Sequence, residues 1–585
     1  MALSPHRFVP RKLRRRMITS LPPHGQVWLR DRLAAAALPE AVDINVAGGV
    51  SRRRPAVIRP DATPMQVRSR NLSLVTGLLE AGAIPYFCPP RSTYSSAVAV
   101  AVQHRDRVLK LLRTGLPPHV TVRPERVRRK PSSVTANMDL SPTQRTVVVY
   151  EATTSGRGGW LLGSRFACVV EFWVDGPNGF LIGANPDEPG NIVQASDPDV
   201  LVQETVLSPL VSRANPMVVR TRSGFARNHD NLVSFPVDAV LTWVDGADPD
   251  WLQRKNSALA ATGQATLNMT AANDARFASK DELRYAMRSL VCNAPWIRQI
   301  FLVTDEQVPP WLNLNHPMVT VVPHRTIFGD VGRLPTFNSH AIESRLHHIP
   351  ELSEHFLYLN DDMFLGRPLS PEKFFHANGM TKFFKSTAAL DPAPPALTDN
   401  PATAAGKNNR RIIEERFGIT ISHKMRHVPY ALRRSVLFEI EQAARADLDA
   451  TASHQFRHPA DVSMTSSLAH YWAYATGRAV PSKLAYTYVD LGSTTARARL
   501  SSLLARRSSD VFCLNDTLDA PDNDDIRMVQ DYLAAYFSYR APFELSDEQT
   551  AHRARFTASQ LLASHAHTVA LPAQADQADP LQLAG

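Results

Sequence analysis

Two adjacent carboxylates follow an apolar run near the middle of the chain. In "EHFLYLNDDMFLG", Asp361 and Asp362 come directly after Phe356–Leu359, and apolar residues resume at once. Two acids at the end of a buried strand can hold Mg²⁺ or Mn²⁺, because hard cations prefer oxygen ligands and magnesium often binds carboxylates together with substrate phosphates. The same pair could instead cap the next turn, so its residues alone leave both interpretations open.

Two further segments with the pattern of buried strands also end in acids. "VDAVLTWVDG" reaches Asp245 and "RQIFLVTD" reaches Asp305, with helical patterns between these segments and after them. Strands that alternate with helices are typical of the α/β class, here a mostly parallel, nucleotide-binding sheet with helices on both faces. Ligands of such sheets bind beyond the carboxyl ends of the strands. The acids therefore predict an active site at that edge.

Histidines and arginines gather in the C-terminal half of the chain. "SHKMRHVPYALRR" contains His427, and "HQFRHPADVS" contains Arg457. Histidine is the usual proton acceptor near neutral pH, and arginine is the usual bidentate phosphate ligand. A single histidine is more often structural, but two such clusters opposite clustered acids meet the needs of phosphoryl transfer. Glu343 in "LPTFNSHAIES" is either a base or a favourable charge near a helix start.

The length of 585 residues predicts two or three domains, because single cores stop growing near roughly 250 to 300 residues. We expect a basic, largely extended arm at 1–60, a small α+β region at 61–230, a catalytic domain at 236–545 and a tail at 546–585. In the α+β region, "VRSRNLSLVTGLLEAG" and "SAVAVAVQHRDRVLKLLRT" predict two helices. "RTVVVYEATTSG", "FACVVEFWVDG" and "GFLIGAN" predict three short strands.

The net charge of +10 and the pI near 9.5 indicate an anionic partner, such as a nucleotide, a membrane surface or an acidic polymer. We expect no nucleic acid, because no binding motif or basic–aromatic interleaving is present. The arginine-rich arm fits either a solvated segment or peripheral contact with anionic membrane. Four widely spaced cysteines, with no apolar leader or membrane-spanning stretch, predict a cytoplasmic protein that could sit at the inner face of the membrane.

Four segments, in this order, resemble the conserved regions of the Stealth family of sugar-1-phosphate transferases. That family includes bacterial capsular and exopolysaccharide phosphotransferases and the catalytic subunit of the animal GlcNAc-1-phosphotransferase. The segments are "VDAVLTWVDGADPDW", the stretch from "DELRYAMRSL" to "LYLNDDMFLG", "SHKMRHVPYALRRSVLFEIE" with "FRHPADVSMTSSLAHYWAYATG", and "VFCLNDT". The resemblance covers about residues 236 to 520.

The resemblance implies a reaction as well as a fold. An acceptor hydroxyl would attack the β-phosphorus of a nucleotide-diphospho-sugar, with a UDP-hexose or UDP-N-acetylhexosamine as the expected donor and Mg²⁺ or Mn²⁺ as the cofactor. Nucleoside monophosphate would leave, and a phosphodiester to a glycan would form, in capsule or exopolysaccharide synthesis. The large inserted domains of the animal enzyme are missing between the four segments, which favours a carbohydrate acceptor. A metal-dependent glycosyltransferase that releases nucleoside diphosphate stays open as the alternative.

The same resemblance assigns roles to single residues. His427 is the expected base, Glu343 is the second choice, and Arg457 is expected to bind phosphate. Asp361 and Asp362 are expected to hold the metal. The remaining expected site residues are Asp245, Gly246 and Asp248 at the nucleotide, Arg410 and Arg411 at phosphate, and Asp516, which would hold metal or orient His427.

Overall fold

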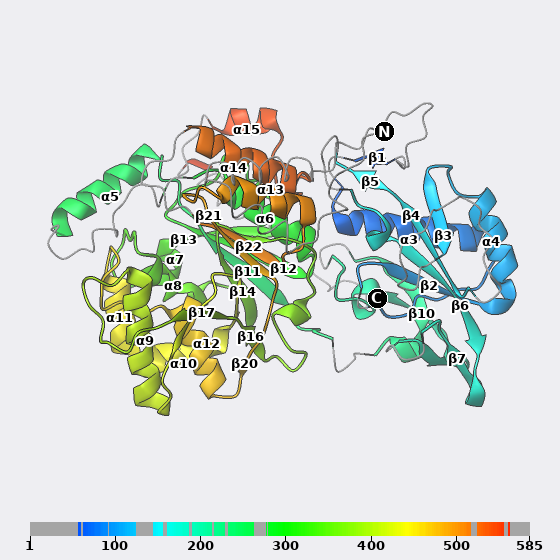
Figure 1. The fold of residues 1–585 in the computed structure, drawn as a ribbon, viewed down its shortest axis with the longest axis horizontal. Helices are drawn as coiled ribbons and strands as arrows, with labels where there is room; N and C mark the ends of the chain where they lie inside the picture. Colours follow the sequence, from blue (N-terminus) through cyan, green and yellow to red (C-terminus); the bar gives the residue numbers. More distant parts are fainter. Residues whose placement is uncertain are drawn as a thin grey trace, which may run out of the picture.

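The structure is a computed structural model that describes most of the chain between residues 56 and 561. The described ranges are 56–59, 62–91, 93–124, 144–155, 161–185, 190–212, 216–227, 232–262, 277, 279–515, 523–554 and 560–561. Nearly all of the expected basic arm, most of the expected tail and Asp516 lie outside them. Figure 1 shows the described chain as two lobes, one built from residues before 228 and one from residues after 231.

The N-terminal lobe is built on a six-stranded sheet. Its strands are β2 (Ser96–Ala101), β3 (Val120–Pro124), β4 (Thr146–Glu151), β6 (Cys168–Asp175), β7 (Phe180–Ile182) and β8 (Ile192–Gln194). Helices α3 (Pro64–Ala81) and α4 (Arg105–Thr114) complete the lobe, with the short pairs β1 (Val57–Ile58) with β5 (Thr153–Thr154) and β9 (Asp199–Gln203) with β10 (Val218–Arg222). The three predicted strands are confirmed as β4, β6 and β7.

The prediction of a single helix over "SAVAVAVQHRDRVLKLLRT" was wrong in its first half. Residues Ser96–Ala101 form β2, which pairs in parallel with β6, and only Arg105–Thr114 is α-helical. The strand consists of small and β-branched residues that are buried on both faces, from Ser96 to Val100. Alanine and valine in continuous alternation suit either state, and the pairing with β6 decides for the strand.

A shared apolar cluster joins the two lobes. Met65 and Val67 from α3 pack with Phe166, and this group meets Cys292 and Tyr539 of the C-terminal lobe. Polar contacts add to it, because Ser155 Oγ donates to Ser538 Oγ at 2.6 Å. The N-terminal lobe is therefore packed against the C-terminal lobe through both apolar and polar side chains.

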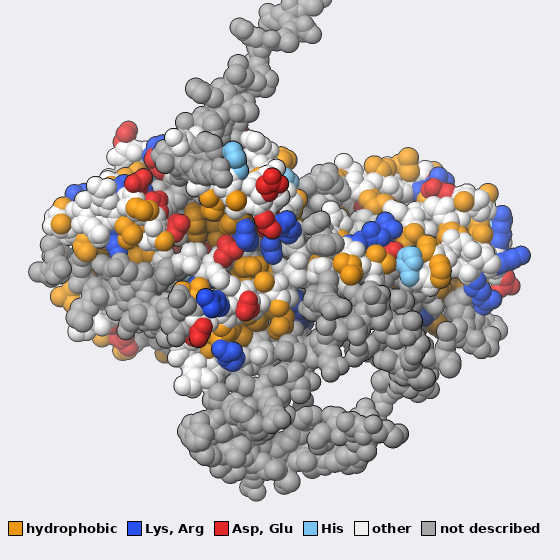
Figure 2. Space-filling model, turned by 90° about the horizontal axis from the view of Figure 1, so that it is seen from above, with side chains coloured by type: hydrophobic (Ala, Val, Ile, Leu, Met, Phe, Trp, Pro, Cys, Tyr) orange, Lys and Arg blue, Asp and Glu red, His pale blue; other side chains and the backbone are white. Residues whose placement is uncertain are grey.

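Exposed basic side chains of the N-terminal lobe include those on α4. Arg107, Lys110 and Arg113 point outward from this helix, while Val108 and Leu112 face the core. Figure 2 shows blue side chains at the outer end of this lobe, which is the end that α4 occupies in Figure 1. This basic surface lies at the far end of the molecule from the C-terminal lobe.

A five-stranded sheet forms the centre of the C-terminal lobe, in the order β13, β12, β11, β14, β19. The strands are β11 (Val237–Thr242), β12 (Ile297–Thr304), β13 (Val319–Pro323), β14 (His355–Asn360) and β19 (Tyr430–Arg433). The first four run parallel, and β19 pairs antiparallel with β14. The predicted α/β class therefore agrees with the structure, and in this one sheet four of the five strands are parallel.

Helices and small sheets surround this central sheet. Figure 1 shows α6, α13, α14 and α15 on one side of the lobe and α8 to α12 on the other. The helices are α5 (Pro249–Thr262), α6 (Glu282–Asn293), α7 (His324–Phe328), α8 (Ser339–Glu343), α9 (Pro401–Phe417), α10 (Arg434–Ala443), α11 (Arg445–Ser453), α12 (Ala469–Ala475), α13 (Ala496–Arg506), α14 (Asn523–Tyr536) and α15 (Asp547–Arg553). The expected tail thus begins with a helix, α15.

The remaining strands form three small sheets. They are β15 (Met363–Leu365) with β22 (Val511–Asn515) and β21 (Tyr486–Asp490), β16 (Thr381–Phe383) with β20 (Ala479–Pro481), and β17 (Lys385–Ala389) with β18 (His423–Met425). Within the described residues, the helices are too short or too polar to cross a lipid bilayer.

The buried imidazole of His470 predicts a loss of stability in acid. Burial lowers the pKa of His470 to about 3. The unfolded chain, with a pKa near 6.5, then binds an extra proton below that pH, so the free energy of unfolding falls as the pH drops. One such group contributes a slope of about 1.4 kcal/mol per pH unit. His470→Phe, which keeps the stacking on Phe383, is expected to flatten this slope.

Urea unfolding at several pH values between 7 and 5 measures the slope directly. His552→Gln, a substitution on the exposed face of α15, serves as the control and is expected to leave it unchanged. Equal slopes for wild type and His470→Phe would contradict the assignment of a neutral, buried His470.

Candidate active site

A cleft of about 830 Å³ opens at the carboxyl ends of the parallel strands. Thr242 of β11 pairs in register with Asn360 of β14, and both line the cleft. Asp305 after β12 and the pair Asp361–Asp362 after β14 line it as well. The expectation that strand-end acids gather at one edge is therefore met for these residues.

His427 and Cys513 hold Asp362 from two sides. His427 Nε2 lies 3.1 Å from Asp362 Oδ1, and Cys513 Sγ donates to Asp362 Oδ2 at 3.2 Å. Burial tends to raise the pKa of Asp362, but its contacts with His427 and Cys513 bring it below the usual value. Burial likewise tends to lower the pKa of His427, and the Asp362 charge raises it overall. The two side chains therefore favour the ion pair.

The neighbouring carboxylate, Asp361, is in the opposite electrostatic situation. Burial and the charges of Glu282 and Asp362 raise its pKa well above the usual value. The donors to its carboxylate are backbone N–H groups of its own turn. Next to it, the buried Oδ1 atom of Asn360 has no hydrogen-bond partner among the described residues. Oxygen atoms that lack a positive partner fit a hard divalent cation such as Mg²⁺.

Glu343 lies deeper in the same cleft, at the end of α8. Its Oε1 atom accepts from Tyr358 Oη at 3.3 Å, and its Oε2 atom accepts from Thr465 Oγ1 at 2.9 Å and Ser466 Oγ at 3.1 Å. The two hydroxyl residues sit on Met464–Leu468, a single π-helical turn of the kind often found at functional sites. Both oxygens of Glu343 are thus engaged by hydroxyl donors.

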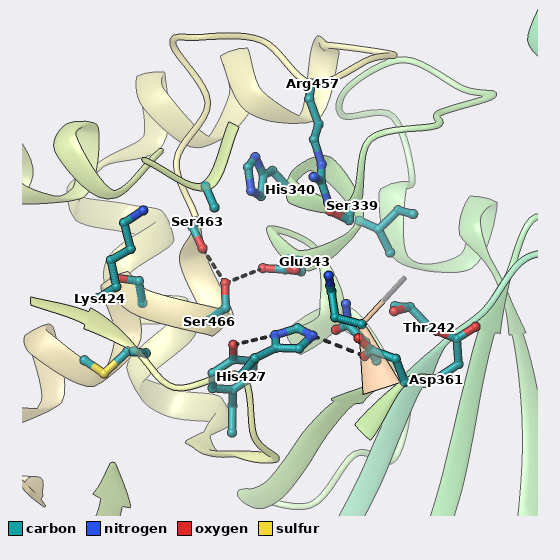
Figure 3. A pocket seen from close by; sticks show the side chains of 18 of the residues that line it. Thr242, Ser339, His340, Glu343, Asp361, Lys424, His427, Arg457, Ser463 and Ser466 are labelled. Atoms are coloured by element: carbon teal, nitrogen blue, oxygen red, sulfur yellow. Dashed lines mark hydrogen bonds and ion pairs between the residues drawn. The ribbon is translucent and has the colours of Figure 1, made fainter. Parts of the chain in front are cut away.

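Arg457, on the loop after α11, reaches into the cleft on the other side of Glu343 from His427 (Figure 3). Its Nη2 atom donates to Ser339 Oγ at 2.8 Å, the one hydrogen bond of this guanidinium found in the described part of the chain. A guanidinium carries five N–H donors, so several stay available to a ligand. Figure 3 shows Glu343 between Arg457 on one side and His427 on the other.

Asp461 fixes the loop that carries Arg457. This fully buried carboxylate accepts from His454 Nδ1 at 2.7 Å, Asn338 Nδ2 at 2.8 Å and the backbone N–H of His458 at 2.8 Å. Burial tends to raise the pKa of Asp461, but His340, His454 and the backbone N–H of His458 lower it to about 2. His454 and His458, which flank Arg457 in sequence, therefore hold the loop of the arginine in place and do not line the cleft.

The turn after β11 sits beside the cleft. Thr242, Trp243 and Val244 line the cleft, whereas the expected nucleotide residues come just after them. These expected residues are Asp245, Gly246 and Asp248. The turn is held by Gln307, whose Nε2 atom donates to Asp248 Oδ2 at 2.8 Å.

Gly246 has a steric role in this turn. A Cβ atom at this position would lie 2.2 Å from the carbonyl oxygen of Phe277. Its backbone N–H donates to the same oxygen at 3.0 Å. A glycine is therefore required by the close approach of the two backbones, whether or not a nucleotide binds there.

The two arginines expected at phosphate lie away from the cleft lining. Arg410 on α9 donates to the carbonyl oxygens of Asp391, Pro392 and Ala393. Arg411 is on the exposed side of α9 and pairs with Glu415 and Asp447. Arg410 therefore holds the loop before α9, and Arg411 belongs to the exposed surface of that helix. Asp516 lies outside the described residues.

Several residues that line the cleft escaped the sequence analysis. Lys280 is 2% exposed, and its Nζ atom lies 3.8 Å from Glu282 Oε1, at the start of α6. His340 on α8 is buried with its Nδ1 atom 3.5 Å from Asp461 Oδ2. Only their sequence neighbours could have indicated these residues. Lys280 and Glu282 flank the acid that begins the "DELRYAMRSL" helix, and His340 precedes Glu343 by less than one helical turn.

Comparisons with known proteins match the four segments named above. Models of the Stealth conserved regions 1, 2, 3 and 4 match residues 235–263, 276–383, 426–474 and 501–555. An exopolysaccharide phosphotransferase of Streptomyces coelicolor is 43% identical over 84% of this chain and 85% of the relative. A second one from that organism is 39% identical over 83% and 92%. Exopolysaccharide phosphotransferase CpsY of Mycobacterium leprae is 34% identical over 84% and 89%.

The cleft of this α/β fold is lined by acids, a histidine and an arginine, and these relatives, all named as phosphotransferases, cover more than four-fifths of the chain. The protein belongs to the Stealth family and is a phosphotransferase.

The contrast between the arginines gives a direct test of the site. Arg457→Gln is expected to lower kcat/KM for phosphotransfer by about 10²-fold or more, because it removes preorganised donors from the cleft. Arg411→Gln, on the exposed face of α9, is expected to stay within about twofold of wild type, since exposed ion pairs contribute little. Steady-state kinetics measures kcat/KM for both variants, and equal melting temperatures show that both are folded. Similar losses of kcat/KM in the two variants would contradict the placement of Arg457 in the site and of Arg411 outside it.

Proposed function

We propose that the protein transfers a sugar-1-phosphate from a nucleotide-diphospho-sugar to a hydroxyl of a glycan, in exopolysaccharide synthesis. The expected donor is a UDP-hexose or a UDP-N-acetylhexosamine. One observation carries the proposal. The oxygens of Asn360 and Asp361, which suit a divalent cation, share a single cleft with the His427–Asp362 pair and Arg457. The name of the relatives supports the exopolysaccharide context.

Asn360 and Asp361 are the residues we assign to the metal, with Glu282 close by. Bound there, Mg²⁺ or Mn²⁺ would supply positive charge to the diphosphate of the donor. This assignment divides the two adjacent acids, because Asp362 is already engaged by His427 and Cys513. Lys280, buried beside Glu282, supplies a second positive charge at the same end of the cleft.

His427 is the base in this proposal. The ring acts as a base in its neutral form, in which Nε2–H donates a hydrogen bond to Asp362 and the Nδ1 lone pair is left for the acceptor hydroxyl. In the structure, Nδ1 lies 3.3 Å from Tyr430 Oη, and the acceptor hydroxyl takes the place of that contact. As the proton moves to Nδ1, the imidazolium that forms is stabilised by the Asp362 carboxylate. The raised pKa of His427 is consistent with this protonated form.

Arg457 orients the phosphate under attack. Its donors offset the charge that builds up on the phosphoryl oxygens, and a bound metal would add to this effect. The acceptor oxygen forms a bond to the β-phosphorus, and the bond from that phosphorus to the bridging oxygen breaks. Nucleoside monophosphate leaves with the electron pair, and the sugar-1-phosphate is joined through a phosphodiester.

The identity of the released nucleotide tests the reaction class. Incubation of the purified protein with Mg²⁺, a UDP-sugar panel and an acceptor glycan is expected to yield UMP in proportion to phosphodiester product. Chromatography separates UMP from UDP. Release of UDP would instead establish the glycosyltransferase alternative, in which the anomeric C–O bond of the sugar is broken.

The division between the two acids gives a second test. Asp361→Asn is expected to weaken Mn²⁺ binding, measured by electron paramagnetic resonance, by about tenfold or more, because it removes a charged ligand. Asp362→Asn is expected to change Mn²⁺ affinity much less while lowering kcat by about 10²-fold, because it removes the partner of the base. A larger loss of Mn²⁺ affinity in Asp362→Asn than in Asp361→Asn would reverse the assignment.

A further inference from the structure

Cys513 reaches the active site from a different sheet. It lies on β22, where it pairs with Met363, the residue that follows Asp362. The side chain is buried, and its Sγ atom is 3.2 Å from Asp362 Oδ2. The catalytic scheme above gives the thiol no chemical step. Cys88, Cys168 and Cys292 are also buried, and they lie in other parts of the fold.

Three different ligand atoms surround one point beside this thiol. A carboxylate oxygen of Asp362, a ring nitrogen of His427 and Cys513 Sγ all lie within 4.8 Å of one another. Tetrahedral Zn²⁺, with bonds of about 2.0 to 2.3 Å, separates its ligand atoms by about 3.3 to 3.8 Å. His427 Nε2 contacts Oδ1 of Asp362 at 3.1 Å and Cys513 Sγ contacts Oδ2 at 3.2 Å, so each contact with the carboxylate is close to that spacing.

The chemistry of this ligand set differs from that of the neighbouring oxygens. Asn360, Asp361 and Glu282 offer only oxygen, which suits Mg²⁺. Thiolate and imidazole favour softer ions such as Zn²⁺ or Co²⁺ and are poor ligands for Mg²⁺. In the described part of the chain, Asp362 has no lysine or arginine in its ion pairs, only His427. A cation at this point therefore has one positive partner to displace, the His427 ring, which loses its Nε2 proton when it becomes a ligand.

We propose that Asp362, His427 and Cys513 form a second cation site, which takes a thiophilic divalent metal such as Zn²⁺. The metal replaces the thiol proton of Cys513, which is released to solvent. His427 binds through Nε2 as a neutral ring, so its proton moves to Nδ1, beside Tyr430 Oη. The fourth position of the metal faces the cleft and takes water or a substrate oxygen.

Occupation of this site would stop catalysis. A metal on Nε2 places the ring proton on Nδ1 and removes the lone pair that accepts the substrate proton. Zn²⁺ is therefore expected to inhibit transfer even when Mg²⁺ is in large excess. This consequence, but not the metal site itself, rests on the proposed function.

Cobalt titration of the full-length protein tests the site without an activity assay. Co²⁺ bound to a thiolate gives a near-ultraviolet charge-transfer band, which we expect at one equivalent and which added Zn²⁺ should abolish. Cys513→Ser is expected to lose this band, whereas Cys292→Ser, a matched buried cysteine, is expected to keep it. Absence of the band in wild type, or its persistence in Cys513→Ser, would overturn the proposal.

A second variant guards against misfolding of Cys513→Ser. His427→Ala changes a half-buried side chain at the cleft, and it is expected to weaken Co²⁺ binding by at least about 10- to 100-fold, the loss that even a hydrogen-bond partner of a ligand typically causes. Unchanged Co²⁺ affinity in a folded His427→Ala protein would count against the site.

The activity assay separates the site from the proposed function. Zn²⁺ is titrated against wild-type UMP release at fixed, excess Mg²⁺, and a zinc-selective chelator is then added to restore turnover. A cobalt band without zinc inhibition would leave the metal site standing and overturn His427 as the base. Failure to release UMP would overturn the proposed function, while the spectroscopic result would still decide the metal site.

Discussion

The antiparallel pairing of β14 with β19 is the constraint on which the cleft depends. Tyr358 pairs with Tyr430, and because the strands run in opposite directions, residues after Tyr358 lie beside residues before Tyr430. Asp362 follows the first strand and His427 precedes the second, so they meet at the same end of the sheet. A slip of one residue would turn alternate side chains to the other face. The buried, stacked rings of Tyr358 and Tyr430 oppose such a slip, since both belong to the main apolar cluster.

The sequence was sufficient to predict those features that have a local pattern. Apolar runs ended by acids marked β11, β12 and β14, and their alternation with helices indicated parallel strands. Parallel strands share one carboxyl edge, so the gathering of Asp305 with Asp361 and Asp362 followed from topology alone. His427 and Arg457 could be named because histidine and arginine suit phosphoryl transfer and because their motifs resemble a known family. Their positions around one cleft needed the structure.

Features that depend on contacts between distant segments could not be predicted. Cys513 lies 151 residues from Asp362 in sequence, and no local sequence pattern at either residue indicates their contact. The sequence shows the charge of Arg410 but not that backbone carbonyls of the preceding loop occupy its guanidinium. The strand β2 has an Ala–Val pattern that also suits a helix, and only its pairing with β6 excludes the helix. In each case the deciding partner lies outside the local segment, at separations that range from 17 residues for Arg410 to 151 for Cys513.

The adjacent acids after β14 differ because one has an internal positive partner and the other does not. Asp362 has His427, which lowers its pKa against the effect of burial. Asp361 has the negative neighbours Glu282 and Asp362, which add to burial and raise its pKa. A divalent cation beside Asp361 would relieve that repulsion and leave excess positive charge in the cleft, which an anionic diphosphate can then balance. Cation and donor are thus expected to bind more tightly together than apart, since each supplies the charge that the other lacks. Under the proposed function, this is a physical reason for a chain to end a buried strand with two carboxylates: one would serve a bound cation, and the other would serve the base.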